Sequence, residues 1–117
     1  MLRRSMLIVR HALLQTHTSP GRRSTLIAGP ACLAGVMPVW MHEIEPESCS
    51  PSTKACGEQT AIVLSGTGKL LLDGAPQRFT SPCTLCVPAG YIWHVVNQDN
   101  VAMRLLAIGA GELVEAL

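Results

Sequence analysis

The chain has 117 residues, of which 48% are hydrophobic and 15% are charged, and its formal net charge at pH 7 is +1. This length accommodates one domain with one core, and this composition excludes an intrinsically disordered chain. The small net charge and the aromatic content of 3% give no reason to expect nucleic acid as a partner.

Short β-rich runs follow one another along the chain, separated by Gly, Pro, Ser, Asp and Asn. No long stretch has the apolar period of an amphipathic helix. The runs predict strands over residues 7–14, 25–28, 36–45, 59–65, 69–72, 77–80, 84–87, 93–97 and 102–108. The tail over residues 111–117 suits either one helical turn or a final strand. Turn signals every 8 to 12 residues or so are typical of an all-β sandwich or barrel.

The N-terminal third of the chain is basic. Five arginines and no acidic residue precede Glu43, and all eight acidic residues lie from Glu43 onward. An arginine-rich, acid-poor start is typical of a targeting peptide. However, the apolar run over residues 6–14 is interrupted by Arg10 and His11, and no clean cleavage site follows it. We therefore expect a retained N-terminal strand and no membrane partner, with a targeting peptide as the alternative.

Two arginines and two histidines of this region permit several roles. Arg22 and Arg23 suit a solvated turn, contact with an anionic ligand, or a subunit interface. His11 and His17 belong to no pattern that indicates chemistry. None of the four is predicted to be a site residue.

The cysteines are odd in number and irregular in spacing. They are Cys32, Cys49, Cys56, Cys83 and Cys86. Without an export signal, this usage predicts reduced thiols and a cytoplasmic location. The last two have the spacing of a redox or zinc motif, but on a predicted strand their side chains fall on opposite faces. Packing is therefore the favoured role for this pair.

Turns and side-chain alternation organise the remainder of the chain. The segment over residues 65–68 predicts a tight hairpin, as does Asp73-Gly74, because glycine accepts positive φ. Residues 88–90 and 98–100 predict further turns.

In the third predicted strand, Glu43 and Glu45 fall on one face, which we expect to meet solvent. The opposite, inner face then carries Trp40, His42 and Ile44. His42 is accordingly a candidate pocket residue.

Two segments of the chain resemble the paired motifs of the cupin family. The segments TAIVLSGTGKLLLDG and FTSPCTLCVPAGYIWHVVNQDNVAMRLLAI reproduce the structural residues of those motifs in order and spacing. The matching positions are Gly66, Pro88, Gly90 and Asn97. The resemblance covers residues 45–108, about half of the chain. It implies one all-β domain over residues 1–117, a cupin jelly-roll β-barrel with N-terminal strands over 1–35 and a core over 36–109.

The positions that bind metal in cupins are occupied here by other residues. The motif glutamate falls on Gln59, beside Glu58, and the histidine of the second motif falls on Trp93, one residue before His94. The two histidines of the first motif fall on Thr53 and Ala55, or on Ser52 and Lys54 with a longer spacer. Strand alternation then points Trp93 inward and His94 outward, unless a bulge exchanges them.

These departures remove most of the donors that a metal site needs. An iron, manganese or zinc ion takes three or four N, O or S donors at about 2.0–2.3 Å, and the side chains of Ala55 and Trp93 supply none. The resemblance therefore implies a cupin without a cofactor. A divalent metal held by Glu58, His42 and His94 is the alternative.

We expect the barrel to bind a small molecule without the usual cupin metal. The predicted ligand-binding residues are Trp40, Thr53, Gln59, Cys86, Tyr91 and Trp93. An isomerase, epimerase or cyclase with His42 or His94 as general base is one alternative. A dioxygenase-like cupin with an unorthodox set of metal ligands, which would also include Cys86, is another.

A homodimer is the expected assembly, because short barrels with apolar edge strands often shield those edges by association. The apolar run over residues 6–14 is the candidate for a strand exchanged between the two copies.

Overall fold

A computed structural model describes residues 8–29 and 37–114, and within them the chain forms two antiparallel sheets and one short 3-10 helix, η1 (His11–Leu13). The six-stranded sheet runs β1 (Thr16–Ser19), β2 (Arg22–Ala28), β3 (Val39–Ile44), β10 (Met103–Ile108), β5 (Gln59–Ser65) and β8 (Cys83–Val87) in spatial order. The five-stranded sheet runs β11 (Gly111–Leu113), β4 (Thr53–Ala55), β9 (Ile92–Asn97), β6 (Thr67–Leu72) and β7 (Ala75–Thr80). The predicted all-β fold is confirmed.

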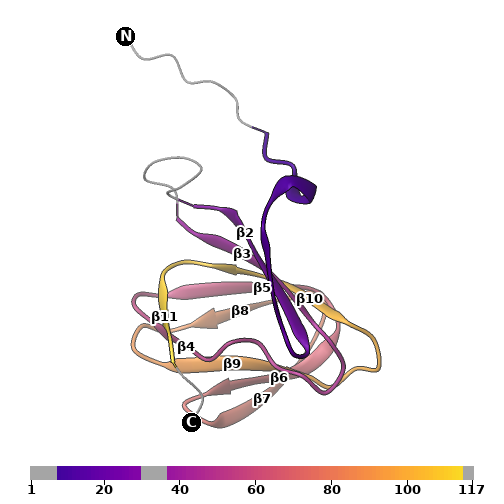
Figure 1. Ribbon diagram of the computed structural model, residues 1–117. Coiled ribbons are helices and arrows are strands. Elements are labelled where there is room, and N and C mark those ends of the chain that lie inside the picture. Colours follow the sequence, from indigo (N-terminus) through magenta and orange to yellow (C-terminus); the bar gives the residue numbers. More distant parts are fainter. Residues whose placement is uncertain (1–7, 30–36, 115–117) are drawn as a thin grey trace.

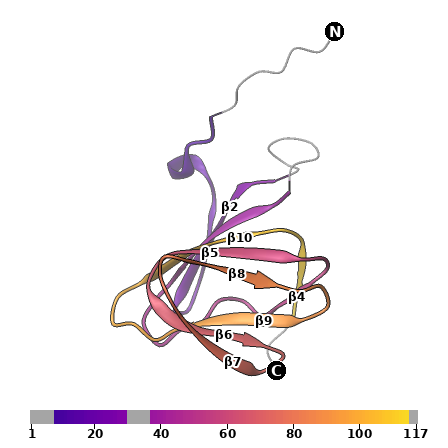
Figure 2. The same ribbon diagram turned by 180° about the vertical axis from the view of Figure 1, so that it is seen from behind.

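The core lies between the two sheets. Alternation along each strand places it there: in β9 the side chains of Trp93, Val95 and Asn97 are buried, while Ile92 is exposed. The other fully buried apolar side chains include Ile44, Ala61, Val63, Val87, Met103 and Leu105. Figure 1 shows the sheets as two stacked layers, and Figure 2 shows β5 and β8 above β9, β6 and β7 from behind.

The hairpin predicted over residues 65–68 is wrong. β5 pairs with β10 and β8, whereas β6 pairs with β7 and β9 in the other sheet, so Gly66 turns a corner between sheets. Its φ is +120°, and a Cβ there would lie 3.0 Å from the Cβ of Met103. The predicted Asp73-Gly74 hairpin is present, with Leu72 paired to Ala75 and positive φ at both turn residues.

The sequence prediction also missed or misplaced short elements. Residues 8–14 form no strand, and no described strand pairs with them; backbone N–H groups of Leu13 and Leu14 instead donate to Arg10 O and His11 O. Residues 6 and 7 lie outside the described residues, as do Cys32 and Val36. The short, polar strands β1 and β4 were not predicted, and β11 settles the alternative that the tail left open in favour of a strand.

The motif asparagine has a structural role. The Nδ2 group of Asn97 donates to Ile44 O (3.0 Å) and Val101 O (2.9 Å), and its Oδ1 accepts from the Asp99 N–H (2.8 Å). One buried side chain thereby ties the β9–β10 connection to the end of β3. This explains the asparagine of the motif without any role in ligand binding.

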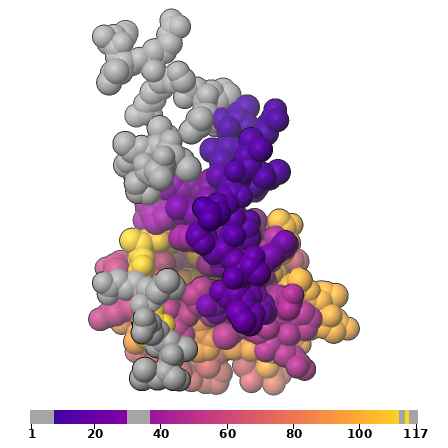
Figure 3. Space-filling view, viewed as in Figure 1, coloured from indigo at the N-terminus to yellow at the C-terminus, as the bar shows by residue number. Residues whose placement is uncertain are grey.

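The β1–β2 hairpin lies across one side of the barrel, with η1 above it (Figure 1), and the indigo residues of the hairpin cover the middle of that face in Figure 3. Its turn contains Gly21, with φ of +79° and a position so close to Ser48 that a Cβ would overlap that side chain. The Glu45 N–H donates to Gly21 O (2.8 Å) and fixes the turn against the barrel. This docking places β1 and β2 over the barrel interior.

Within the described ranges, no helix has the length and apolarity needed to span a membrane.

Candidate functional site

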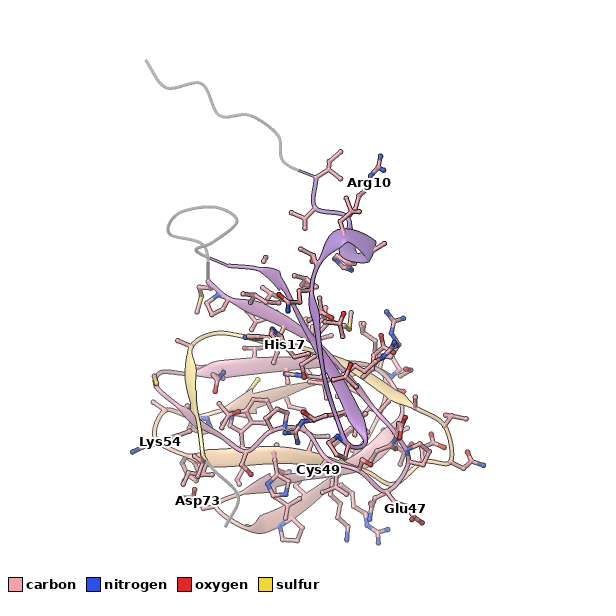
Figure 4. All side chains as sticks on the ribbon, in the orientation of Figure 1. Arg10, His17, Glu47, Cys49, Lys54 and Asp73 are labelled. Carbon is pink, nitrogen blue, oxygen red and sulfur yellow. The ribbon has the colours of Figure 1, made fainter. Side chains whose placement is uncertain are left out.

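A cavity of about 490 Å³ opens between the β1–β2 hairpin and the inner faces of the two sheets. Its size is that of a small-molecule site. The lining combines hydroxyl, imidazole and indole groups from both sheets: His17, Ser19, Arg22, Ser24, Trp40, His42, Ser50, Pro51, Thr53, Gln59, Trp93, Ala107, Gly109 and Gly111. Figure 4 labels His17 where β1 crosses the barrel.

The polar side of the cavity is built by register across β1, β2 and β3. His17 pairs with Ser24, and Ser24 pairs with His42, so the three side chains form one cross-strand row. Beyond β3 the same row continues with Leu105 and Val63, which are fully buried. This row is therefore polar at the hairpin end and apolar at the other end.

His42 lies at the boundary between these two parts. Its side chain is 8% exposed, and its Nδ1 lies 2.7 Å from the Oγ of Ser24. Burial, and secondly the positive charge of Arg22, lower the pKa of His42 to about 4. His42 is therefore uncharged at neutral pH and forms a polar, neutral wall of the cavity.

Arg22 is the charged group of the lining. It is half-buried, and its Nη1 donates a long hydrogen bond of 3.4 Å to Cys49 O. Its neighbour Arg23 points to the outer face, where its Nη2 lies 2.7 Å from Glu43 Oε2. The two adjacent arginines thus have opposite surroundings, one at the cavity and one in a surface ion pair.

Trp93 and Gln59 form the floor of the cavity. The Nε1–H of Trp93 donates to Gln59 Oε1 (2.9 Å), and the Nε2 of Gln59 donates to Gly109 O (3.4 Å). Both side chains are almost fully buried, at 3% and 4% exposed. Trp93 also pairs across strands with Thr53, which borders the same space.

Flat rings line one wall. The rings of Trp40 and His42 are nearly parallel, with an interplanar angle of 4° and centroids 6.2 Å apart. The ring of His17 also lies near that of Trp40, with centroids 6.2 Å apart and an interplanar angle of 52°. This wall combines the apolar indole ring of Trp40 with the polar imidazole rings of His42 and His17.

Three of the positions that align with cupin metal ligands, Thr53, Gln59 and Trp93, lie together at the cavity, but the residues on them do not fit a metal ion. Trp93 and Gln59 satisfy each other's polar atoms, and Ala55 is buried without a donor. Of the residues that the structure describes, no three His, Cys, Asp or Glu side chains cluster closely enough to hold one ion. The polar atoms at these positions form hydrogen bonds with one another and with the backbone, and they leave no set of donors for a metal ion.

Five residues predicted for the site lie together at the cavity: Trp40, His42, Thr53, Gln59 and Trp93. Four others do not line it. His94 points to the outer face of β9, since alternation places Trp93 and Val95 inside. Cys86 is exposed on the outer face of β8 for the same reason, and Tyr91, 41% exposed, precedes β9 at a turn. Glu58 is exposed beside the buried Gln59, so no bulge brings it inward.

The sequence reasoning assigned His42 to the pocket and left contact of Arg22 with an anionic ligand open, but it did not assign the other residues on the polar side of the cavity. His17 and Ser19 come from the unpredicted β1, and Arg22 and Ser24 come from the part of β2 that lay before the predicted strand. Alternation within Thr16–Ser19 does place His17 and Ser19 on one face. Which face of β1 meets the barrel depends on the pairing of β1 with β2. The sequence of a single short strand does not indicate that pairing.

Comparisons with known proteins identify the fold. No protein-family model and no curated protein sequence matches the chain. Solved structures do match it. The polyketide cyclase RemF from Streptomyces resistomycificus has a TM-score of 0.74 at 15% identity, over 97% of this chain and 88% of that one. A predicted oxalate decarboxylase from Thermotoga maritima has a TM-score of 0.75 at 15% identity, over 92% and 100% of the two chains.

A cupin domain from Schizosaccharomyces pombe also matches, with a TM-score of 0.69 at 13% identity over 86% of this chain and 71% of that one. At these identities the likeness is one of fold. The chain therefore has the cupin fold, as the motif resemblance implied.

Proposed function

From the cupin fold and this cavity, we propose that the chain binds a small organic molecule inside its barrel without the metal ion that many cupins use. The observation that carries the proposal is the hydrogen bond between Trp93 and Gln59 at the motif positions. It replaces metal donors with a closed floor, while a cavity of about 490 Å³ remains above it. Planar rings and hydroxyl groups around that space suit a ligand with an apolar body and a few polar atoms.

The test is thermal shift and calorimetry with a broad panel of metabolites, in buffer containing a chelator. We expect some compounds to raise the melting temperature of the wild-type protein. Trp40→Ala removes a wall of the cavity and should abolish that rise. Tyr91→Ala, an exposed aromatic residue away from the cavity, is the matched control and should retain it. A panel without any stabilising compound would contradict ligand binding.

The absence of a metal requires its own measurement. Protein produced in medium supplemented with iron, manganese, nickel and zinc should contain each metal at well below one equivalent by elemental analysis. Chelator treatment should leave the melting temperature unchanged. A stoichiometric metal that survives purification would overturn the metal-free proposal and revive a metal-dependent enzyme.

A second candidate function is proton-transfer catalysis, for an isomerase, epimerase or cyclase. The pair of Ser24 and His42 at the cavity, 2.7 Å apart, favours it, and one structure of the same fold is a polyketide cyclase. Against it stands the lowered pKa of His42 (about 4), because a general base works best with a pKa near the operating pH. Turnover of a bound ligand that His42→Gln abolishes would establish this function, whereas unchanged ligand after long incubation would exclude it.

We also propose that the chain forms a homodimer and resides in a reducing compartment. The outer face of the six-stranded sheet carries a row of apolar side chains, Met41, Leu106 and Ile62, across three strands. A second copy would cover them. Among the described residues Cys49, Cys56, Cys83 and Cys86 are free thiols, which is the usual state in the cytoplasm.

A further inference from the structure

We propose that the ligand of the cavity is a planar organic carboxylate whose carboxylate group pairs with Arg22. This inference rests on the proposed function and names the chemical class that the cavity selects. It follows from the charge of the lining, the position of Arg22 and the flat wall beside it.

The first argument is the charge of the lining. Among the described residues that line the cavity, Arg22 carries a permanent charge, and no aspartate or glutamate is present. Arg22 pairs with Ile44, whose two chain neighbours are carboxylates: Glu43 is held by Arg23 on the outer face, and Glu45 is exposed. A half-buried guanidinium without a carboxylate partner is costly to desolvate, and an anionic ligand offsets that cost.

The second argument is how Arg22 is held. The turn at Gly21 docks against Ser48, and the Glu45 N–H donates to Gly21 O, so the start of β2 has a fixed position. Ser19 lies directly across from Arg22 in the register of the hairpin. A guanidinium and a hydroxyl group presented together on one rigid hairpin are donors that match the two oxygens of a carboxylate.

The third argument concerns the rest of the ligand. Beyond Arg22 the wall consists of the nearly parallel rings of Trp40 and His42, and the floor of Trp93. These surfaces suit a flat, apolar body. One fixed cation balances one negative charge, which favours a monoanionic carboxylate over a phosphate dianion. His42 does not add a second charge at neutral pH, because its pKa is lowered by burial.

The experiment compares acids with their primary amides. Calorimetry would use benzoate and benzamide, 2-naphthoate and 2-naphthamide, and cinnamate and cinnamamide, each against wild type, Arg22→Gln and Arg23→Gln. Both variants lose one positive charge, but only the first removes it from the cavity. We expect at least one acid to bind about tenfold or more tightly than its amide, since a hydrogen bond between charged groups is about twice as strong as one between neutral groups. Arg22→Gln should remove that preference, and Arg23→Gln should change it by less than about twofold.

Each other outcome overturns a stated part of the proposal. Equal binding of acid and amide, or a preference for the acid that persists in Arg22→Gln, would contradict the assignment of a carboxylate to Arg22. Neither result would contradict ligand binding in the cavity. If Arg23→Gln also loses the preference for the acid, that preference depends on the net charge of the protein alone. This result would likewise contradict the role of Arg22. If none of the six compounds binds but neutral compounds of the metabolite panel do, the anion inference fails alone. If nothing binds, it fails together with the proposed function.

Discussion

The contact between Gln59 and Trp93 shows how far single positions can be read from the sequence. The motif resemblance located both residues, and alternation placed Trp93 inside. The hydrogen bond between them could not be predicted, because it joins side chains from different sheets, 34 residues apart. Because of this hydrogen bond, the two residues that depart from the motif satisfy each other's polar atoms and form a closed floor.

A double-mutant cycle tests this floor. Trp93→Phe and Gln59→Leu should each cost about 1–3 kcal/mol in the free energy of unfolding, because each leaves a buried polar group without its partner. In the double variant neither buried polar group is left without its partner. Its loss in the free energy of unfolding should therefore be about 1 kcal/mol smaller than the sum of the losses in the two single variants. Urea denaturation of the four proteins measures this coupling. Strictly additive costs would show that the contact contributes nothing to stability.

His42 predicts a pH dependence with a definite sign. Its pKa is about 4 in the folded protein, below the usual 6.5, so the unfolded chain takes up a proton first as the pH falls. Stability is therefore highest above pH 6.5, falls as the pH drops toward 4, and stops falling below that. Between about pH 7.5 and about pH 5 the loss is about 2 kcal/mol.

Urea denaturation at the two pH values, for wild type and His42→Gln, isolates this effect. The variant keeps a polar side chain toward Ser24 but does not titrate, so its stability should fall by less over the same range. The pKa of His94 is also lowered by burial, and His94→Gln serves as the control that should retain most of the wild-type loss. If wild type and His42→Gln respond to pH alike, His42 is not buried as a neutral imidazole.

At the scale of elements, the sequence predicted those strands whose alternation is long and apolar. The predicted strand over residues 59–65 coincides with β5, and the prediction over 93–97 differs from β9 by one residue. β1 and β4 were not predicted. Their four and three mostly polar residues are too few to show the alternation of apolar and polar side chains that identifies a strand. Tertiary pairing decides such strands: Thr16 Oγ1 and Thr25 Oγ1, 2.9 Å apart, help to hold β1 on β2. Because β1 was not predicted, its residues His17 and Ser19 were not assigned to the cavity.

The hairpin turn offers an element-scale prediction with a matched control. Gly21 and Gly74 both have positive φ, at +79° and +86°, but a Cβ would overlap Ser48 at Gly21 and meet nothing within 4 Å at Gly74. Alanine at either site should cost about 1–2 kcal/mol from the left-handed backbone. Gly21→Ala should cost more than that and should also weaken ligand binding, because the shifted turn moves Arg22. Calorimetry with the carboxylate that binds most tightly checks this. Equal affinity in both variants would show that the turn at Gly21 does not position Arg22 for binding.

Both outer faces of the molecule carry charged side chains, including the row of Arg23, Glu43 and Arg104 on the six-stranded sheet, but they differ in how their apolar side chains are arranged. On the six-stranded sheet, Met41, Leu106 and Ile62 lie side by side across β3, β10 and β5. The outer face of the five-stranded sheet places charged or ionisable groups among its apolar ones, including Lys69 and His94 on β6 and β9. The sequence analysis assigned the dimer contact to a strand exchanged over residues 6–14, and residues 8–14 of that run form no strand. The contrast between the faces is visible only once the sheet order is known.

This contrast yields the last prediction, on the proposed dimer. Leu64 on β5 is 44% exposed on the outer face of the six-stranded sheet, and Ile92 on β9 is 38% exposed on the outer face of the other sheet. A stable dimer buries about 800 Å² on each partner, and an uncompensated charge within that area opposes association by several kcal/mol. Leu64→Glu should therefore convert a dimer to a monomer in light scattering at micromolar concentration, while Ile92→Glu, with similar exposure, should leave the dimer intact. Since both positions already meet solvent, neither change should alter folding much, and circular dichroism verifies this for each variant. A wild-type monomer would reject the dimer, and dissociation by Ile92→Glu but not by Leu64→Glu would move it to the five-stranded sheet.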